Sequence, residues 1–187
     1  MKFDIILAGV GGQGVLSLAA IIATGAMKDN LKVRQSEVHG MAQRGGAVLS
    51  HLRISDSEIS SDLVAKGTAS LIISMEPLEV LRYVDYLSPD GSVVTASEPF
   101  VNIPDYPDIE VIYGKIKKLK NHKIVESLEL AKKAGTSRAA NMVIIGAASS
   151  VLPVSAGSLQ AAVEELFSSK GKDVVDINLK AFALGAE

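Results

Sequence analysis

The residues with the clearest chemical meaning form a glycine-rich loop that directly follows the apolar run Ile5–Ala8. Residues 9–14 read Gly-Val-Gly-Gly-Gln-Gly, and their glycine spacing matches the dinucleotide-binding fingerprint. Glycines permit a tight turn close to a ligand, and N–H groups at the start of the following helix attract an anion. The same loop also begins helices in folds that bind no nucleotide, so both interpretations stay open. The candidate ligand-facing residues are Gly9, Gly11, Gly12, Gln13 and Gly14.

A second candidate region covers residues 36–46, which have no clean hydrophobic period. A dinucleotide site needs an acidic residue ~20 residues beyond the glycine loop to bind the ribose, and Glu37 lies near that distance. Glu37 could equally anchor a loop. The Arg44 guanidinium, beside two glycines, suits a phosphate or carboxylate, or an ion pair across a subunit interface. His39 could titrate near neutral pH, although a lone histidine is more often a structural hydrogen-bond donor.

A third candidate region is the start of an expected helix at residues 136–141, Thr-Ser-Arg-Ala-Ala-Asn. Hydroxyl groups at a helix start, with a guanidinium one step inside, favour an anion, so Ser137 and Arg138 are candidate ligand contacts. Ordinary helix capping is the alternative interpretation. Asn141 lies within an apolar stretch, where a buried amide needs a partner or faces an interface.

The composition excludes several kinds of chemistry. The chain has 187 residues and no cysteine, so it can form neither a disulfide framework nor a cysteine-ligated iron–sulfur cluster of its own. Its three histidines lack metal-ligand spacing, and no nucleophile triad or catalytic carboxylate pair is evident. The net charge of −2 and the absence of a basic stripe argue against a nucleic-acid partner. The lysines at residues 115–123 are interpreted as a solvated surface segment.

The strands and helices expected around these residues indicate an α/β fold. The high Ala, Val, Ile and Leu content is typical of a buried parallel sheet covered by helices. We expect a single domain over residues 1–187, with a Rossmann-like, mostly parallel sheet flanked by helices and an inserted β-hairpin. Strands are expected at residues 3–8, 31–38, 47–54, 71–74, 92–95 and about 109–113, with a short strand from Ile59. Helices are expected at about residues 12–27, 77–87, 127–133, 138–150, 158–167 and 173–184.

Several local signals fix the expected connections. The first strand, helix and second strand predict a right-handed parallel βαβ unit. The turn at residues 56–57 predicts a hairpin between the strand at 47–54 and the one from Ile59. Pro77 suits a first helical turn, Gly135 a helix C-cap, and Ser158 a helix N-cap. A turn is expected at residues 89–91.

The first residues favour a strand rather than a signal peptide, because Asp4 and Gly9 interrupt the apolar run and no cleavage site follows. No apolar run reaches transmembrane length. We therefore expect a soluble cytoplasmic protein without a membrane partner.

Together, three segments resemble the gamma-type subunits of 2-oxoacid:ferredoxin oxidoreductases, most closely those of the indolepyruvate branch. They are the glycine loop, Glu-Val-His-Gly-Met-Ala-Gln-Arg-Gly-Gly at residues 37–46, and Ser-Arg-Ala-Ala-Asn-Met at residues 137–142. The block beginning at Ser36 is far more specific than the glycine fingerprint. The resemblance extends over essentially the full chain, with shorter matches at residues 62–63, 74–77 and 100–104.

The resemblance implies a complex that oxidatively decarboxylates an arylpyruvate, such as indolepyruvate. Coenzyme A and oxidised ferredoxin would be consumed, and aryl-acetyl-CoA, carbon dioxide and reduced ferredoxin formed. A large partner subunit would contain thiamine diphosphate and the iron–sulfur clusters, which agrees with the absence of cysteine here. This chain would bind no cofactor tightly, would be inactive alone, and could form a homodimer when isolated.

Within that complex, we hypothesise that residues 11–14 and Arg44 contact the coenzyme A pyrophosphate or the partner subunit. Two other interpretations stay open. One is a free-standing NAD(P)-dependent oxidoreductase that uses the same loop, and the other is a nucleotide-binding module without catalytic activity.

Overall fold

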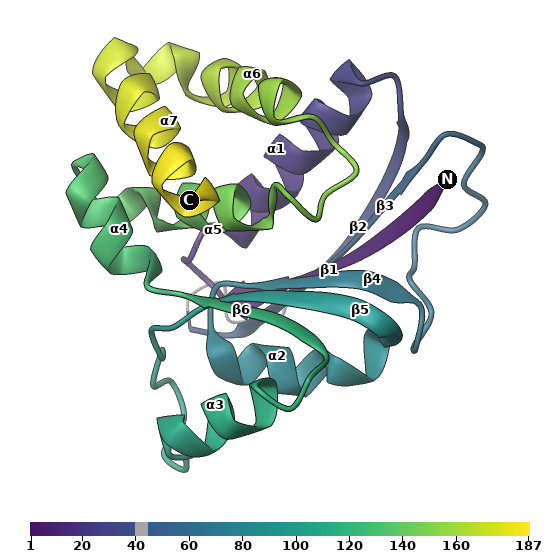
Figure 1. Cartoon of the computed structure of the whole chain (residues 1–187), viewed down its shortest axis with the longest axis vertical. Helices are drawn as coiled ribbons and strands as arrows, with labels where there is room; N and C mark the ends of the chain where they lie inside the picture. The colour runs from purple at the N-terminus through teal and green to yellow at the C-terminus, as the bar shows by residue number, and fades with distance from the viewer. Residues whose placement is uncertain (40–44) are drawn as a thin grey trace.

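The computed structural model describes residues 1–39 and 45–187. Within these residues, a six-stranded sheet has the order β2-β3-β1-β4-β5-β6, with helices on both faces (Figure 1). The strands are β1 (Lys2–Val10), β2 (Lys32–His39), β3 (Ala47–Ser55), β4 (Ala69–Ser74), β5 (Leu87–Ala96) and β6 (Asn121–Val125). This arrangement confirms the predicted α/β class and the mostly parallel sheet with a hairpin.

Seven α-helices cover the described sheet. They are α1 (Val15–Lys28), α2 (Pro77–Tyr83), α3 (Ile109–Ile116), α4 (Ser127–Ala134), α5 (Ala140–Ala148), α6 (Ala156–Phe167) and α7 (Lys172–Ala186). Three short 3-10 helices follow or precede them: η1 (Val84–Tyr86), η2 (Ser137–Ala139) and η3 (Ser168–Lys170). α2 and α3 pack on one face of the sheet, and α1 and α4–α7 lie on the other (Figure 1). No helix in the described residues is long and apolar enough to cross a bilayer.

β1 is the buried centre of the sheet. Its residues Ile5, Ile6, Leu7 and Ala8 are fully buried, because β1 lies between β3 and β4 and both sheet faces are covered. Successive side chains of a strand point to opposite faces, so Ile5 and Leu7 join the larger core under α1 and α5, and Ile6 joins the smaller core over α2.

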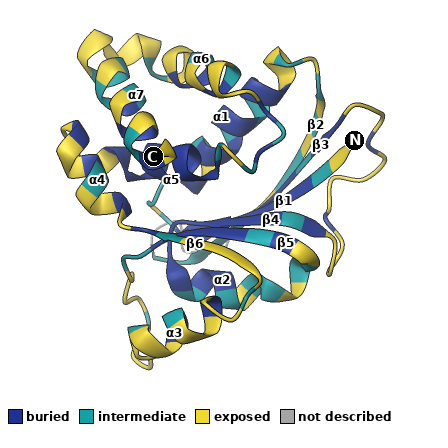
Figure 2. Ribbon diagram, in the orientation of Figure 1, coloured by how far each residue is buried: buried dark blue, intermediate teal, exposed yellow. Residues whose placement is uncertain are grey.

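α5 is the most deeply buried helix, as Figure 2 shows along its whole length. Its small residues let α7 approach backbone to backbone. A Cβ atom at Gly146 would lie 2.0 Å from the Phe182 carbonyl oxygen, and one at Gly185 would lie 2.0 Å from the Val143 carbonyl oxygen. The prediction that this alanine- and glycine-rich helix packs closely against another element is confirmed, and α7 is that element.

The predicted parallel βαβ unit is wrong. β2 is not a neighbour of β1, because β3 lies between them and pairs antiparallel with both. The hairpin is therefore formed by β2 and β3, and Ile59 begins no strand. The alternating pattern of residues 47–54 correctly predicts a strand, but the chain that follows the turn after it does not form another strand of the sheet.

The predicted strand at residues 109–113 is also wrong, because these residues begin α3. The Asp108 carboxylate accepts a hydrogen bond from the Glu110 N–H at 2.8 Å, which caps the helix. Ile112 and Ile116 are both buried and lie four residues apart, on one face of the helix. Two prolines just before the helix favoured an extended segment, so this helical spacing was not recognised in the sequence.

The real sixth strand, β6, was missed because its first residues are polar and exposed, as edge strands often are. The lysines of residues 115–123 are all exposed, as expected. Residues 89–91, predicted as a turn, lie within β5 beside a register shift.

The predicted capping residues are mostly confirmed. Pro77 is the first residue of α2, and Gly135 ends α4 with a φ of 139°. Ser155, rather than Ser158, caps α6, and its hydroxyl accepts a hydrogen bond from the Ser158 N–H at 3.2 Å. The Asp29 carboxylate at the end of α1 binds both serines, which joins α1 to α6.

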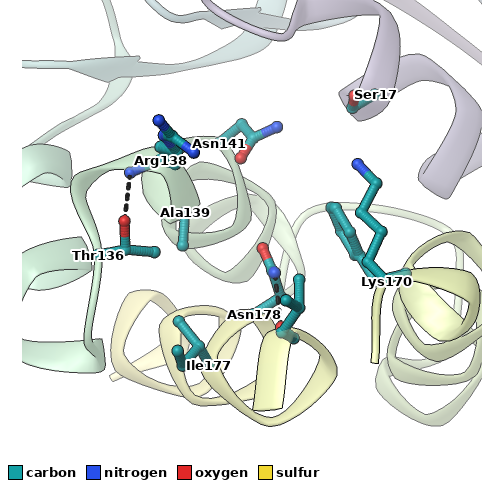
Figure 3. Close-up of a pocket in the computed structure, with 10 residues that line it drawn as sticks. Ser17, Thr136, Arg138, Ala139, Asn141, Lys170, Ile177 and Asn178 are labelled. Carbon is teal, nitrogen blue, oxygen red and sulfur yellow. Dashed lines mark hydrogen bonds between the residues drawn. The ribbon is translucent and has the colours of Figure 1, made fainter. Parts of the chain in front are cut away.

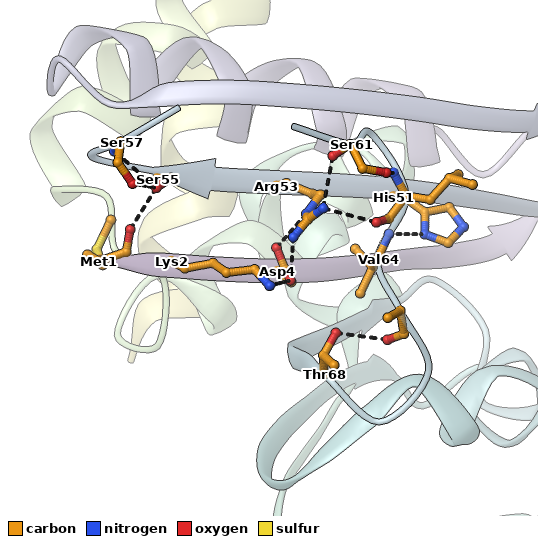
Figure 4. A network of polar contacts seen from close by, with 12 residues as sticks. Met1, Lys2, Asp4, His51, Arg53, Ser55, Ser57, Ser61, Val64 and Thr68 are labelled. Atoms are coloured by element: carbon orange, nitrogen blue, oxygen red, sulfur yellow. Dashed lines mark hydrogen bonds and ion pairs between the residues drawn. The ribbon is translucent and has the colours of Figure 1, made fainter. Parts of the chain in front are cut away.

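A polar network holds the segment after β3 against the sheet (Figure 4). The Arg53 guanidinium donates two hydrogen bonds to the buried Asp4 carboxylate, at 2.9 and 3.2 Å, and two more to the Ser61 and Leu63 carbonyl oxygens. Because all these donors are used within the protein, this network is structural.

His51 holds the same segment at the next residue, Val64. Its ring Nδ1 accepts a hydrogen bond from the Val64 N–H at 3.2 Å, and its ring packs edge-on against Tyr86. Burial lowers the pKa of His51 from its usual 6.5, because the charged ring would lose hydration.

We predict that this histidine makes stability depend on pH. Below about pH 6.5 the unfolded chain takes up a proton at His51 that the folded chain resists, so the free energy of unfolding falls towards about pH 5. Urea unfolding of His51→Asn, which keeps an acceptor but does not titrate, should show a shallower pH slope. His122→Asn on exposed β6 is the matched control, and a slope unchanged in His51→Asn would contradict the prediction.

Candidate functional site

The candidate site lies at the carboxyl edge of the sheet. β1, β4, β5 and β6 are parallel, so their carboxyl ends meet at one edge, and the glycine loop follows β1 there. In open α/β sheets, ligands bind outside the carboxyl ends of the strands. The loop that sequence reasoning singled out is therefore in the position where a ligand is expected.

The glycine loop needs glycine for two different reasons. Gly12 and Gly14 have φ angles of 103° and 82°, in the left-handed region that other residues rarely adopt. At Gly9, a Cβ atom would lie 2.8 Å from Val15 Cγ2 and 3.1 Å from Met75 Cβ, so β1 and α1 pack too closely for a side chain. Gly14 is the N-cap residue of α1, and no side chain caps this helix. The first N–H groups of α1 are therefore left for the loop or for an anion.

Gln13 is used within the protein. Its Oε1 accepts a hydrogen bond from the Val10 N–H at 2.7 Å, and its Nε2 donates to the Met75 carbonyl oxygen at 3.2 Å. The side chain thus joins the end of β1 to the residue that follows β4. Gln13 also borders the pocket described next, so a ligand contact stays a prediction.

A pocket of about 210 Å³ opens beside this loop. Its other walls come from the segment after β5 and from the first residues of α4 and α5. Its lining includes the side chains of Gln13, Glu98, Phe100, Leu128, Arg138 and Asn141. Ser137 also borders this pocket, so the structure brings both predicted residues of the third region to the glycine loop.

A larger pocket of about 470 Å³ adjoins the first, because Arg138 and Asn141 border both (Figure 3). It lies between α1, α5, η3 and α7. Two cations, Arg138 and Lys170, and the apolar side chains of Phe167, Val174 and Ile177 line it. None of its lining residues is acidic, so this space favours an anion that also has an apolar part.

Two buried asparagines face this larger pocket (Figure 3). The Asn141 Oδ1 accepts the Met142 N–H at 3.1 Å, and its Nδ2 lies 2.8 Å from where a Cβ atom of Gly14 would stand. The Asn178 Nδ2 donates to the Val174 carbonyl oxygen at 2.7 Å. The expectation that a buried Asn141 needs a partner is confirmed for its Oδ1, whose partner is the Met142 N–H.

Glu98 is a pocket residue that sequence reasoning missed. Its carboxylate accepts hydrogen bonds from the Ser127 hydroxyl at 2.9 Å and the Leu128 N–H at 2.8 Å, and so caps α4 from another element. Lys170 and Asn178 were missed as well. For Asn178, the i, i+3, i+4 spacing with Val174 and Ile177 was the available signal.

The second candidate region is only partly described. Glu37 is exposed on β2 opposite Ser50, and its carboxylate accepts a hydrogen bond from the Gln35 amide. The backbone of His39 ends β2, and Arg44 lies outside the described residues. Because β3 separates β2 from β1, Glu37 is on a strand about 10 Å from β1, twice the usual strand spacing. This distance disfavours a ribose contact of the dinucleotide type.

No group of three or more His, Asp or Glu side chains gathers as metal ligands in the part of the chain that the structure describes. The carboxyl edge therefore brings together cations, helix N–H groups and amides, with the Glu98 carboxylate occupied by its hydrogen bonds to the start of α4. Helix N–H groups and cations are the groups that attract an anion.

Comparison with known proteins decides the family. The family described as pyruvate ferredoxin/flavodoxin oxidoreductase matches residues 4–187. This chain belongs to that family. Indolepyruvate oxidoreductase subunit IorB of Archaeoglobus fulgidus is 36% identical over 99% of this chain and 94% of that protein. The subunit of the same name from Pyrococcus horikoshii is 36% identical over 100% of this chain and 95% of its own length.

Solved structures share the fold. A 2-oxoglutarate:ferredoxin oxidoreductase from Magnetococcus marinus, with 2-oxoglutarate, coenzyme A and succinyl-CoA bound, matches with a TM-score of 0.77 and 22% identity. That match covers 99% of this chain and 30% of the other. Pyruvate oxidoreductase subunit PORC from Thermotoga maritima matches with a TM-score of 0.74 and 20% identity, over 98% of this chain and 94% of the other.

Family membership confirms the resemblance that the glycine loop and the two motif blocks predicted, while the contacts of individual site residues stay predictions. Of the ten predicted site residues, the structure places Gly12, Gln13, Ser137 and Arg138 around one pocket. In this family member, Glu37 lies on a separate edge strand.

We predict that Gln13→Ala lowers the free energy of unfolding by about 1–3 kcal/mol, because it leaves the Val10 N–H and Met75 carbonyl without their partner. Gln13→Glu should also destabilise, since an oxygen would replace the Nε2 donor facing the Met75 carbonyl. Chemical denaturation measures both. Gln160→Ala, at an exposed position of α6, is the matched control, and a Gln13→Ala variant as stable as that control would contradict a structural role for the Gln13 side chain.

Proposed function

We propose that this chain is the small subunit of an indolepyruvate:ferredoxin oxidoreductase that acts in the cytoplasm. The observation that supports this most is the 36% identity, over nearly the full length of both chains, with subunits named for that enzyme. The complex would convert an arylpyruvate, coenzyme A and oxidised ferredoxin into aryl-acetyl-CoA, carbon dioxide and reduced ferredoxin.

A large partner subunit is part of the proposal. The chain has no cysteine, so clusters that pass electrons to ferredoxin need ligands from another chain, and thiamine diphosphate is assigned to the same partner. Ketoisovalerate oxidoreductase subunit VorA of Methanothermobacter thermautotrophicus is 28% identical over 97% of this chain but only 35% of its own length. In this relative, the unit that matches our chain is therefore part of a longer polypeptide. This supports close contact between our chain and a second chain.

The role of this chain in the complex is to bind coenzyme A. Coenzyme A has a pyrophosphate, a further phosphate on the ribose and an aromatic adenine whose flat face packs on apolar side chains, so it needs cations and an apolar surface together. The paired pockets offer the α1 N-terminus, Arg138 and Lys170 next to Phe167 and Ile177. The Arg138 guanidinium has no hydrogen bond or ion pair to any described residue, which leaves its donors available. Arg44 remains a predicted contact from the sequence alone.

In this mechanism the chain's own residues bind and orient a co-substrate. The glycine loop and Arg138 would hold phosphate groups, and Phe100 and Leu128 would form the apolar rim beside them. When bound on the partner, thiamine diphosphate supplies the carbanion chemistry at the keto carbon. The residues of this chain would direct the coenzyme A thiol towards that partner.

The two alternative functions are less well supported. A dinucleotide-dependent oxidoreductase uses the end of the strand next to β1 to bind the ribose, with an acidic residue for NAD. Here β3 occupies that place, and β2 with Glu37 lies one strand further. A nucleotide-binding module without a partner would leave the family's full-length match unexplained. A fluorescence titration with NADH separates these functions, because only the dehydrogenase requires tight binding.

The proposal is tested by purifying the chain from its native cells and assaying the eluate. We expect a large brown partner to co-purify, with indolepyruvate-dependent and coenzyme A-dependent reduction of a viologen dye. Omitting coenzyme A is the internal control. A colourless chain that purifies alone and shows no activity would contradict the proposed function and favour the binding module.

We predict that Arg138→Ala raises the KM of the complex for coenzyme A roughly tenfold, because one charge-assisted contact to a phosphate is lost, with little change in kcat. Arg138→Lys should fall between wild type and alanine, since it keeps the charge but not the fork of donors. Steady-state kinetics on the assembled complex measure both. Lys180→Ala, an exposed cation on α7, should leave KM unchanged, and an Arg138→Ala enzyme that behaves like it would exclude this contact.

A further inference from the structure

The segment between β5 and α3, residues 97–107, lies across the carboxyl edge of the sheet, and we call it the strap. Glu98, Pro99 and Phe100 of the strap form one wall of the smaller pocket. Much of the strap is exposed, including 42% of Phe100 and 69% of Val101, so burial alone does not fix it. Its position must therefore depend on specific hydrogen bonds.

Glu76, the second residue after β4, makes the central bonds. Its side chain is 1% exposed. One carboxyl oxygen, Oε2, accepts the Glu79 N–H at 2.9 Å and caps α2, while the other, Oε1, accepts the Phe100 N–H at 3.3 Å and the Tyr106 hydroxyl. A single buried carboxyl group thus joins the rigid end of β4 to both halves of the strap.

The hydrogen-bond donors to Glu76 are important because the nearby cation does not pair with it. The nearby Arg82 guanidinium is bound to Glu79 instead, with Nε 3.1 Å from Oε1. Glu79 Oε2 is buried and has no hydrogen-bond partner among the described residues, and burial raises the Glu79 pKa. Within the described residues, Glu76 is therefore satisfied by two backbone N–H groups and the Tyr106 hydroxyl.

Tyr106 is well suited to remain a donor. Burial, followed by the hydrogen bond to Glu76, raises the pKa of the Tyr106 hydroxyl far above its usual range, so it keeps its proton at physiological pH. The Asn102 amide also donates to the Gly45 carbonyl at 2.8 Å, which joins the strap to the residues before β3.

We propose that Glu76 and Tyr106 are a positioning pair, which sets the strap and so places Phe100 as a wall of the coenzyme A pocket. This inference rests on the proposed function for the pocket. Neither residue borders the pocket, so each acts through Phe100. Loosening the pair leaves the partner's chemistry intact but lets the pocket wall move, which weakens coenzyme A binding.

The test compares Tyr106→Phe with Tyr86→Phe in the assembled complex. Both variants remove one tyrosine hydroxyl, but Tyr86 lies at the opposite edge of the sheet, where β5 begins. We expect Tyr106→Phe to raise the KM for coenzyme A roughly tenfold with kcat within about twofold of wild type, as for loss of one hydrogen bond to an acidic group. Tyr86→Phe should match wild type.

A second readout needs no ligand. Hydrogen–deuterium exchange of residues 98–101 should become roughly tenfold faster in Tyr106→Phe without coenzyme A, because the strap opens more often. Glu76→Gln should also speed this exchange, because its NH2 group must face either the Glu79 N–H or the two strap donors in place of an accepting oxygen. Thermal stability and assembly of the Tyr106→Phe complex should stay at the level of Tyr86→Phe.

The outcomes separate this proposal from the function it rests on. If coenzyme A fails to protect residues 98–101 in the wild-type complex, the coenzyme A site is wrong and the pair's role in it is overturned too. If wild type is protected but Tyr106→Phe changes neither exchange nor KM, only the positioning pair is overturned. A Tyr106→Phe variant that lowers kcat alone, or prevents assembly, also overturns it and indicates a general structural role.

Discussion

The end of β1 imposes the constraint on which the candidate site depends. β1 is buried on both faces, so its backbone groups must be satisfied where it leaves the sheet and turns into α1. The Gln13 side chain does this by binding the Val10 N–H and the Met75 carbonyl, while the Gly11 N–H donates to the Gly46 carbonyl at 2.8 Å. The glycine loop is consequently held from β3 on one side and β4 on the other, with its helix N-terminus facing outward.

Because β3 lies next to β1, the glycine loop cannot bind a nucleotide in the way that it does in a dinucleotide fold. In a dinucleotide fold the second strand lies beside the first, and its terminal acidic residue reaches the ribose of a nucleotide on the loop. Here β3 takes that place, and β2 with Glu37 moves to the sheet edge. The chain therefore keeps the glycine loop of the motif but not the strand position that binds the ribose. That combination suits a ligand whose phosphates are recognised while its other end reaches towards another chain.

The sequence predicts the local parts of this arrangement and fails where distant segments meet. A strand, glycine loop and helix follow one another in the chain, so their pattern is sufficient. The partner of β3 is not local: an alternating strand pairs equally well with either neighbour, and only the packed sheet selects β2 over the segment at Ile59. α3 was misread because prolines precede it and only two of its residues, Ile112 and Ile116, are buried. Lys170 and Asn178 reach the site from η3 and α7, which no sequence spacing relates to the glycine loop.

Helix α5 shows how a residue far from the pockets controls them. Asn141 lies in its first turn and Arg138 in η2 just before it, and both border the two pockets. Gly146 lies further along α5 and contacts the α7 backbone. That contact fixes α7 against α5 and therefore sets the separation of Asn141 and Asn178 across the larger pocket. A larger side chain at Gly146 would have to push α7 away, because the nearest atoms are backbone and interiors are close-packed. The small residues of α5 thus determine the shape of the larger pocket as much as the side chains that line it.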